Sequence, residues 1–165
     1  MGENVERAVE RILIVNDNGE SVAKALSGML VRGAASAGAG NYEVVTAVLQ
    51  IEGLEKYVEY VERGKPFDAV LTNLPEFAAK IRAMDETSSS GRRTVTIGTT
   101  GSNFKEREER VFDKIVQLPV DTRELVNIVR NLLDQRALGR KSISASALQS
   151  GAQVKATGEK IKGTV

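Results

Sequence analysis

Residues 67–77, FDAVLTNLPEF, contain a short apolar run that ends in polar residues and a proline. The run from Ala69 to Leu71 has no polar interruption, which is typical of a strand covered on both faces of a parallel sheet. Asn73 follows this strand directly, so the segment is expected to deliver a polar side chain to one edge of the sheet. An enzyme of this architecture would be expected to carry a carboxylate where this amide stands.

Working outward, four further β-rich runs recur along the chain, and most of them are followed by a helical pattern. The predicted strands cover residues 11–15, 42–48, 68–73, 94–101 and 113–120. The predicted helices cover residues 21–31, 51–66 (ended by Gly64 and Pro66), 76–86, 102–112 and 121–133. This alternation predicts an α/β fold, a (βα)5 doubly wound parallel sheet in three α/β/α layers. The common strand order, 2-1-3-4-5, brings the ends of strands one and three to the functional edge.

Apolar residues at helical spacing predict which side of each helix is buried. The predicted inward residues are Val22, Leu26, Met29 and Leu30; Leu54, Val58 and Val61; Phe77, Ile81 and Met84; and Leu125, Ile128, Val129 and Leu132. The expected helix caps are Asp17 or Asn18, Ser102 or Asn103, and the pair Asp121 and Glu124. Residues 32–41, RGAASAGAGN, are small and are expected to form a loop rather than to extend the first helix.

Composition restricts the possible chemistry. The chain has 165 residues, enough for one domain with a genuine core, and it contains no Cys and no His. Disulfides, thiolate zinc sites and histidine bases are therefore excluded. No stretch approaches the roughly 20 apolar residues that span a bilayer. With a charged N-terminus and no apolar signal region, the chain is expected to be cytoplasmic, with no membrane partner.

The domain is expected to cover residues 11–138, after an N-terminal extension at residues 1–10. Residues 139–165 are rich in Ser, Ala, Gly and Lys and are expected to form a disordered or weakly helical basic tail. This tail holds five basic residues and one acid, so residues 1–138 have a net charge of −3. An acidic body gives little support to nucleic-acid binding.

Four stretches, in this order, resemble the receiver domains of two-component response regulators, of the flavodoxin-like CheY type. They are RILIVNDN (residues 11–18), FDAVLTNLP (67–75), VTIGTTG (95–101) and FDKIVQLPVDTRELVNIVRNLL (112–133). The resemblance implies a phosphorylation site at the strand ends, built from an aspartate nucleophile, an acidic pair that holds Mg²⁺, a hydroxyl, a lysine and a switch aromatic. The matching positions are Asn73, Asn16 and Asp17, Thr99 (or Thr100), Leu118 and Ile115.

Most of that chemistry is missing from these positions. The amide of Asn73 cannot form an acyl phosphate, and Asp17 alone is expected to hold Mg²⁺ only weakly. Without the acidic cluster a lysine would lack its counter-charge, so the apolar Leu118 becomes tolerable. The replacements are mutually consistent and predict a degenerate pseudo-receiver that is not an enzyme and needs no cofactor or metal. A simpler interpretation is that Asn73 bonds neighbouring backbone groups and that Asp17 caps a helix.

Three functions remain open from the sequence. The leading hypothesis is a phosphorylation-independent protein-interaction module in two-component-type signalling, using the surface of the fourth helix, fifth strand and fifth helix to bind a protein partner or a second copy of the chain. That surface would comprise Lys105, Arg107, Glu108, Arg110, Asp113, Ile115, Arg123, Asn127 and Arg130. The alternative is a domain that binds a nucleotide or small ligand in the strand-end crevice, although NDNGE and TTGSN are weak phosphate motifs. A third hypothesis keeps phosphorylation, at Asp17 or at a serine of the tail.

Overall fold

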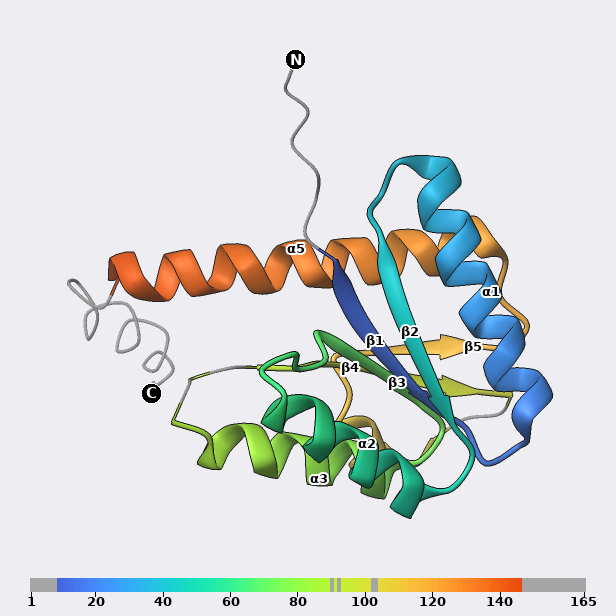
Figure 1. The fold of residues 1–165 in the computed structure, drawn as a ribbon, viewed down its shortest axis with the longest axis horizontal. Helices are drawn as coiled ribbons and strands as arrows, with labels where there is room; N and C mark the ends of the chain where they lie inside the picture. Colours follow the sequence, from blue (N-terminus) through green and yellow to red (C-terminus); the bar gives the residue numbers. More distant parts are fainter. Residues whose placement is uncertain (1–8, 90, 92, 102–103, 147–165) are drawn as a thin grey trace, which may run out of the picture. The chain divides into compact units, whose positions relative to one another are not determined.

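The computed structural model describes residues 9–89, 91, 93–101 and 104–146, and the chain divides into two units, residues 1–133 and 134–165. The first unit contains one parallel five-stranded sheet (Figure 1). Its strands are β1 (Glu10–Val15), β2 (Tyr42–Ala47), β3 (Ala69–Thr72), β4 (Val95–Thr100) and β5 (Lys114–Gln117). The strand order is β2-β1-β3-β4-β5, so the predicted flavodoxin-like topology is confirmed.

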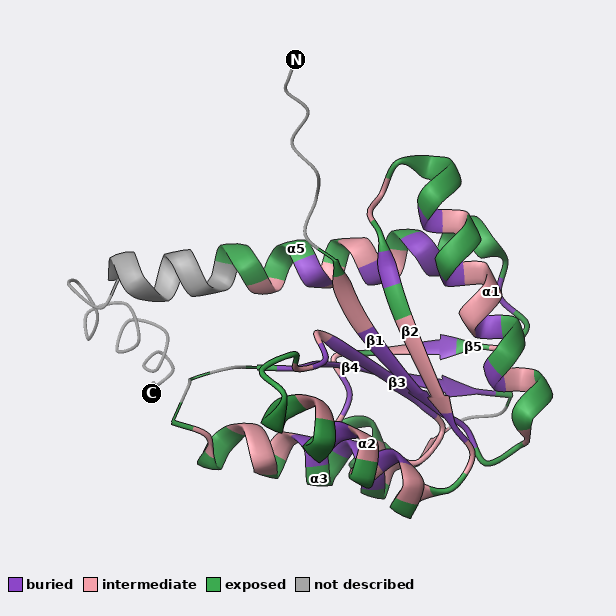
Figure 2. Cartoon of the chain, viewed as in Figure 1, coloured by how far each residue is buried: buried purple, intermediate pink, exposed green. Residues whose placement is uncertain are grey.

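Helices alternate with these strands along the chain. They are α1 (Glu20–Ala37), α2 (Gln50–Glu62), α3 (Pro75–Thr87), α4 (Glu106–Glu109) and α5 (Thr122–Ser146). Buried residues of α1 and α5 form one core cluster with one face of the sheet, and those of α2 and α3 form a second cluster with the other face. The central strands are buried on both sides (Figure 2), which explains the uninterrupted apolar runs of Ile12 to Val15 and Ala69 to Leu71.

The predicted loop at residues 32–41 is wrong for its first six residues, because α1 continues to Ala37. The small residues there serve close packing between helices. A Cβ added to Gly33 would lie 2.5 Å from Thr122 Cγ2 and 2.8 Å from Val126 Cγ2, so a glycine is needed where α1 meets α5. The helix ends at Gly38, whose φ of 66° is the left-handed conformation that glycine adopts easily.

The predicted inner face of α2 is also largely wrong. Val58 and Val61 are exposed, and the buried residues of this helix are Gly53 and Tyr57. A Cβ on Gly53 would lie 2.6 Å from Val15 Cγ2, so the helix backbone sits close to β1 at this point. Because residues 53 and 57 share one side of a helix, this contact turns the ring of Tyr57 inward as well.

Burial of Tyr57 is made possible by partners for its hydroxyl group. This group donates to Asp85 Oδ1 at 2.7 Å and lies 2.8 Å from Thr94 Oγ1. The ring also stacks on Phe67, at 6.3 Å between centroids. The Tyr57 network thus links α2, α3 and the start of β4. A tyrosine whose hydroxyl group is hydrogen-bonded therefore packs on the core, where helical spacing had predicted valines.

The predicted buried side of α3 and the predicted caps of the last two helices were correct in part. Phe77 and Ile81 are buried as predicted, and Glu124 N donates to Asp121 Oδ1 at 2.8 Å, which confirms that cap. The predicted fourth helix is much shorter, and its cap position is Lys105; the expected caps Ser102 and Asn103 lie outside the described residues.

The predicted boundary at residue 138 does not coincide with the end of the last helix. α5 extends to Ser146, so residues 139–146 continue this helix where the disordered or weakly helical tail was expected to begin. Residues 134–141, DQRALGRK, consist mainly of good helix formers, which explains why the helix continues. The remainder of the predicted tail, residues 147–165, and residues 1–8 of the predicted extension lie outside the described residues.

Candidate functional site

The strand ends bring four of the predicted site residues to one face of the sheet. Asn16, Asn73, Thr99 and Leu118 each lie two positions after a buried residue of the α1–α5 core cluster. Side chains alternate between the two faces along a strand, so all four belong to the α1–α5 side. The adjacent strands β1, β3 and β4 therefore place the first three at neighbouring positions on the carboxyl edge.

Asp17 and Asn73 form a reciprocal pair across β1 and β3. The Asn73 Nδ2 group donates to Asp17 Oδ1 at 2.7 Å, and the Asp17 backbone N–H donates to Asn73 Oδ1 at 3.2 Å. The amide thus uses both its donor and its acceptor. An aspartate at position 73 would keep the acceptor but place a second carboxylate against Asp17, so the observed pair is specific to an amide.

Neither of the expected residues caps α1. The N-cap is Gly19, with no side-chain hydrogen bond, and Asp17 is engaged by Asn73 instead. Asn18 contributes only its backbone, because Asn18 N donates to Asn16 Oδ1 at 2.9 Å. This bond closes a local Asx-type turn that leads the chain from β1 toward the helix.

Two buried polar atoms at this edge have no hydrogen-bond partner among the described residues. Asn16 and Thr99 both have 0 % relative exposure, and among the described residues no group bonds Asn16 Nδ2 or Thr99 Oγ1. Leaving a buried donor unsatisfied costs about 1–3 kcal/mol, so such groups in a folded protein call for an explanation. Both are at strand ends that the sequence identified, although their lack of partners could not be foreseen from it.

Apolar groups occupy the positions where the receiver resemblance implied a lysine and an aromatic. Leu118 packs partly buried against the α1–α5 core cluster, and its backbone N–H donates to Thr100 O at 2.7 Å. The Leu118–Pro119 peptide bond is cis. Ile115 is partly buried on β5. In the described part of the chain, no three carboxylates gather closely enough to hold a metal ion.

Two residues of the predicted interaction surface are structural. Asp113, before β5, accepts hydrogen bonds from Arg82 Nη2 at 3.1 Å, Arg93 Nη2 at 2.6 Å and Thr96 N at 2.8 Å. Its side chain is only 14 % exposed, so it ties α3 and β4 to β5 rather than offering a free charge.

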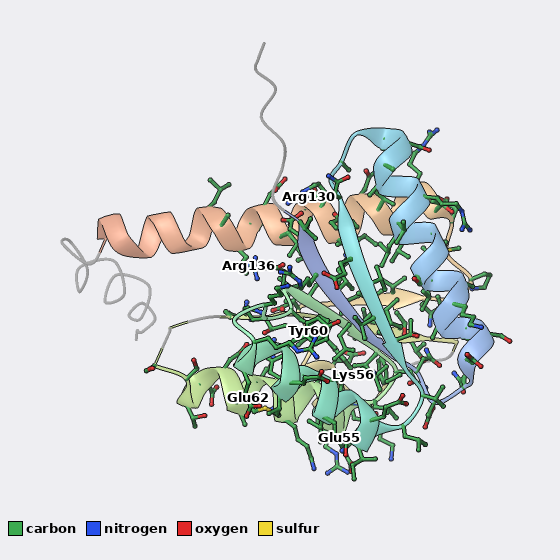
Figure 3. The ribbon with its side chains drawn as sticks, viewed as in Figure 1. Glu55, Lys56, Tyr60, Glu62, Arg130 and Arg136 are labelled. Atoms are coloured by element: carbon green, nitrogen blue, oxygen red, sulfur yellow. The ribbon has the colours of Figure 1, made fainter. Side chains whose placement is uncertain are left out.

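Arg130 has a similar structural role on α5. Its two terminal nitrogens donate to the carboxylate of Glu10 at 2.8 and 3.0 Å, and Nη1 also donates to Ala39 O at 2.9 Å (Figure 3). This bidentate pair fixes α5 to the start of β1 and to the turn before β2. Neither Asp113 nor Arg130 is therefore the free surface charge that the sequence analysis expected.

The remaining predicted surface residues fall into two groups. Lys105, Arg107 and Arg110 are exposed around α4, and Glu108 accepts a hydrogen bond from Lys105 N at 2.8 Å. Arg123 and Asn127 instead line a hollow of about 460 Å³ between α5 and α1, together with Arg32 and Ser36. The predicted surface is thus split between α4 with β5 and the α1 flank of α5.

Structural comparison shows what this fold is similar to. The chain resembles the structure of a response regulator receiver modulated diguanylate cyclase from Pelobacter carbinolicus, with a TM-score of 0.60 and 15 % identity over 80 % of this chain and 98 % of that one. It also resembles the response regulatory domain of protein mrkE from Klebsiella pneumoniae, with a TM-score of 0.55 and 11 % identity over 77 % and 98 % of the two chains.

A third similar structure is a CheY-like response regulator receiver domain protein from Methanospirillum hungatei, with a TM-score of 0.51 and 11 % identity over 77 % of this chain and 97 % of that one. At such low identities the similarity concerns the fold alone: the chain has the CheY-like receiver fold. No family model matches the sequence, and no curated protein matches it. In the described residues no helix is long and apolar enough to cross a bilayer.

Proposed function

We propose that this chain is a pseudo-receiver, a non-enzymatic protein-interaction module in two-component-type signalling that works without phosphorylation. The observation that carries the proposal is the pair formed by Asp17 and Asn73. A receiver needs a nucleophilic carboxylate at that strand end, and here an amide occupies it and bonds both ways with its neighbour.

The surroundings of the pair support the same proposal. Phosphoryl transfer to a carboxylate needs positive charge to offset the developing negative charge, normally from Mg²⁺ and a cationic side chain. Leu118 supplies no charge at the lysine position, and Asp17 is the one carboxylate among the positions that match the receiver site. Asn16 is neutral and fully buried, so it cannot complete an acidic pair.

Incubation with acetyl phosphate and Mg²⁺, followed by intact mass measurement, tests the absence of phosphorylation. The expected result is an unchanged mass for the wild-type protein, for Asn73→Asp and for Asp17→Asn. A phosphoryl adduct on the wild type would refute the proposal, and its loss in Asp17→Asn would assign the modification to that residue. An adduct retained in Asp17→Asn would direct the search to other acceptors by peptide mapping.

The proposed contact surface is the exposed part of α4 with β5. Arg107 and Arg110 are exposed there, and Ile115 is partly buried on β5, a mixture that suits a specific protein contact or a symmetric one between two copies. Light scattering coupled to size exclusion distinguishes a dimer from a monomer. If this surface forms a dimer, Arg107→Glu with Arg110→Glu should weaken it, and Lys80→Glu, at an exposed position of α3, should not.

A second candidate function, binding of a small ligand at the strand-end crevice, is favoured by one observation. Asn16 Nδ2 and Thr99 Oγ1 are buried and lack protein partners among the described residues, as groups reserved for a ligand would. Thermal-shift screening with nucleotides and flavins tests this candidate. A large shift that disappears in Thr99→Val, which removes the hydroxyl and keeps the side-chain shape, would support ligand binding over the pseudo-receiver proposal.

A further inference from the structure

Helix α2 carries a second apolar stripe in addition to the side that packs on the sheet. Ile51, Leu54, Val58 and Val61 follow one another at intervals of three, four and three residues, which is the spacing of a coiled-coil seam. Ile51 is 65 % exposed, Val58 42 % and Val61 36 %, and Leu54 is partly buried. Leu54 packs against the α2–α3 core cluster, so the stripe adjoins the core-facing side of the helix, and its other three residues extend onto the exposed surface.

The surface around this stripe is hollowed on both sides. A shallow, open hollow of about 390 Å³ on α2 itself is lined by Ile51, Leu54 and Val58 together with glutamates of the same helix. Another of about 210 Å³ lies between α2 and α3, where Val58 and Val61 meet Met84. Val58 borders both hollows, so side chains from a docked helix could enter on either side of it, as knobs enter holes in helix packing.

The charge beside the stripe is acidic. Glu55, Glu59 and Glu62 line the larger hollow, and Glu59 is paired with Arg63 on its own helix. Glu55 and Glu62 are exposed (Figure 3), and in the described part of the chain neither forms an ion pair. An apolar seam with free carboxylates at its border is complementary to an apolar seam bordered by lysine or arginine.

We propose that α2 is the docking site for a basic amphipathic helix of a partner protein. From Ile51 to Val61 the stripe runs about 15 Å along the helix, at 1.5 Å per residue, so it fits a partner helix of about three turns. This inference goes beyond the proposed function, since it concerns a surface on the opposite side of the sheet from α5 and does not depend on whether the chain is phosphorylated.

Two other occupants fit the same observations less well. A second copy of the chain would bring two acidic borders together, which is unfavourable because like charges would face each other across the seam. The basic end of this chain has the right charge, but its glycines at residues 151, 158 and 163 disfavour a continuous helix. A partner helix with apolar residues at seam spacing and basic neighbours has neither disadvantage.

Fluorescence anisotropy with designed helical peptides tests the proposal on the full chain. The probe is a fluorescein-labelled peptide of about two heptads, long enough to cover the three turns of the stripe, with Leu at the two seam positions and Lys at the flanking positions. The expected result is saturable one-to-one binding that weakens at high salt. Val58→Glu should reduce the affinity at least tenfold, and Glu55→Lys with Glu62→Lys should reduce it as well. A matched peptide with Glu at the flanking positions should not bind.

The matched control variant is Val31→Glu, because Val31 is 41 % exposed on α1, away from α2. It should bind the basic peptide as the wild type does. Circular dichroism melts of all variants establish that each is folded, so that a loss of binding in Val58→Glu is not a loss of structure.

Several outcomes would overturn the proposal. Absence of saturable binding by wild type, or equal binding by wild type and Val58→Glu, would show that the stripe is not a docking site for such a helix. A concentration-dependent dimer that Val58→Glu abolishes would assign the stripe to a second copy. Tighter peptide binding after Lys155→Glu, Lys160→Glu and Lys162→Glu together would assign it to the chain's own basic end. None of these outcomes would affect the acetyl phosphate test, so the two proposals fail separately.

Discussion

The substitution Asn73→Asp changes one group at the strand-end site from an amide to a carboxylate of the same shape. It removes the donor that lies 2.7 Å from Asp17 Oδ1 and places two carboxylates together. Losing a hydrogen bond to a charged group costs about 1.5 kcal/mol at the lower end of its range. Repulsion between the charges adds about 1 kcal/mol at 4 Å in water, the appropriate limit because Asp17 is exposed. We therefore expect about 2.5 kcal/mol of destabilisation at low salt.

Urea unfolding at neutral pH measures this loss as a midpoint lowered by about 1.2 M, for a denaturant slope of about 2 kcal/mol per molar. The two carboxylates also create a site for Mg²⁺, and an ion present at ten times its dissociation constant restores about 1.4 kcal/mol. Wild type and the control Asn73→Ala should show no such Mg²⁺ dependence. Equal midpoints for wild type and Asn73→Asp, with or without Mg²⁺, would refute the conclusion that this amide meets Asp17 across β1 and β3.

Two further predictions concern the structure that supports the site. Tyr57→Phe should lower the free energy of unfolding by about 1.5 kcal/mol, because the phenol donates a hydrogen bond to the Asp85 carboxylate. The control Tyr60→Phe should change this free energy little. Thermal or urea melts that shift equally for the two variants would count against the Tyr57 network. Gly98→Ala should destabilise by about 1–3 kcal/mol, since the added Cβ would lie 2.9 Å from two phenylalanine rings. At Gly101 the same change meets no atom of the described residues within 4 Å, so it should leave the melting temperature unchanged.

The sheet was predictable from the sequence because short runs rich in apolar and β-branched residues alternate with helical patterns and with turn residues. The orientation of α2 was not, since Val58 and Val61 have a spacing that suits a buried side as well as an exposed stripe. What decides the orientation is the contact of Gly53 with β1, and this depends on residues distant in the sequence. The extension of α1 escaped prediction for a similar reason, because small residues suit a tight helix contact as well as a loop.

At the candidate site, the sequence identified the strand-end positions correctly, because alternation along parallel strands fixes which side chains reach the edge. It did not provide the pairing of Asp17 with Asn73, since helix capping was an equally good use for that carboxylate. Nor could it separate structural charges from free ones. Asp113 and Arg130 are charged residues of the kind found on protein surfaces. Only the distances to their hydrogen-bond partners show that they connect elements of the fold.

The contact between Gly33 and α5 has a genetic consequence. Any missense change at this position adds a Cβ atom. That atom would lie 2.5 Å from Thr122 Cγ2 and 2.8 Å from Val126 Cγ2. The codon for residue 33 is therefore a place where random mutagenesis should yield temperature-sensitive alleles. Such alleles would deplete the whole protein on a shift to higher temperature, and the cellular processes that then fail would reveal its role whatever its partners are.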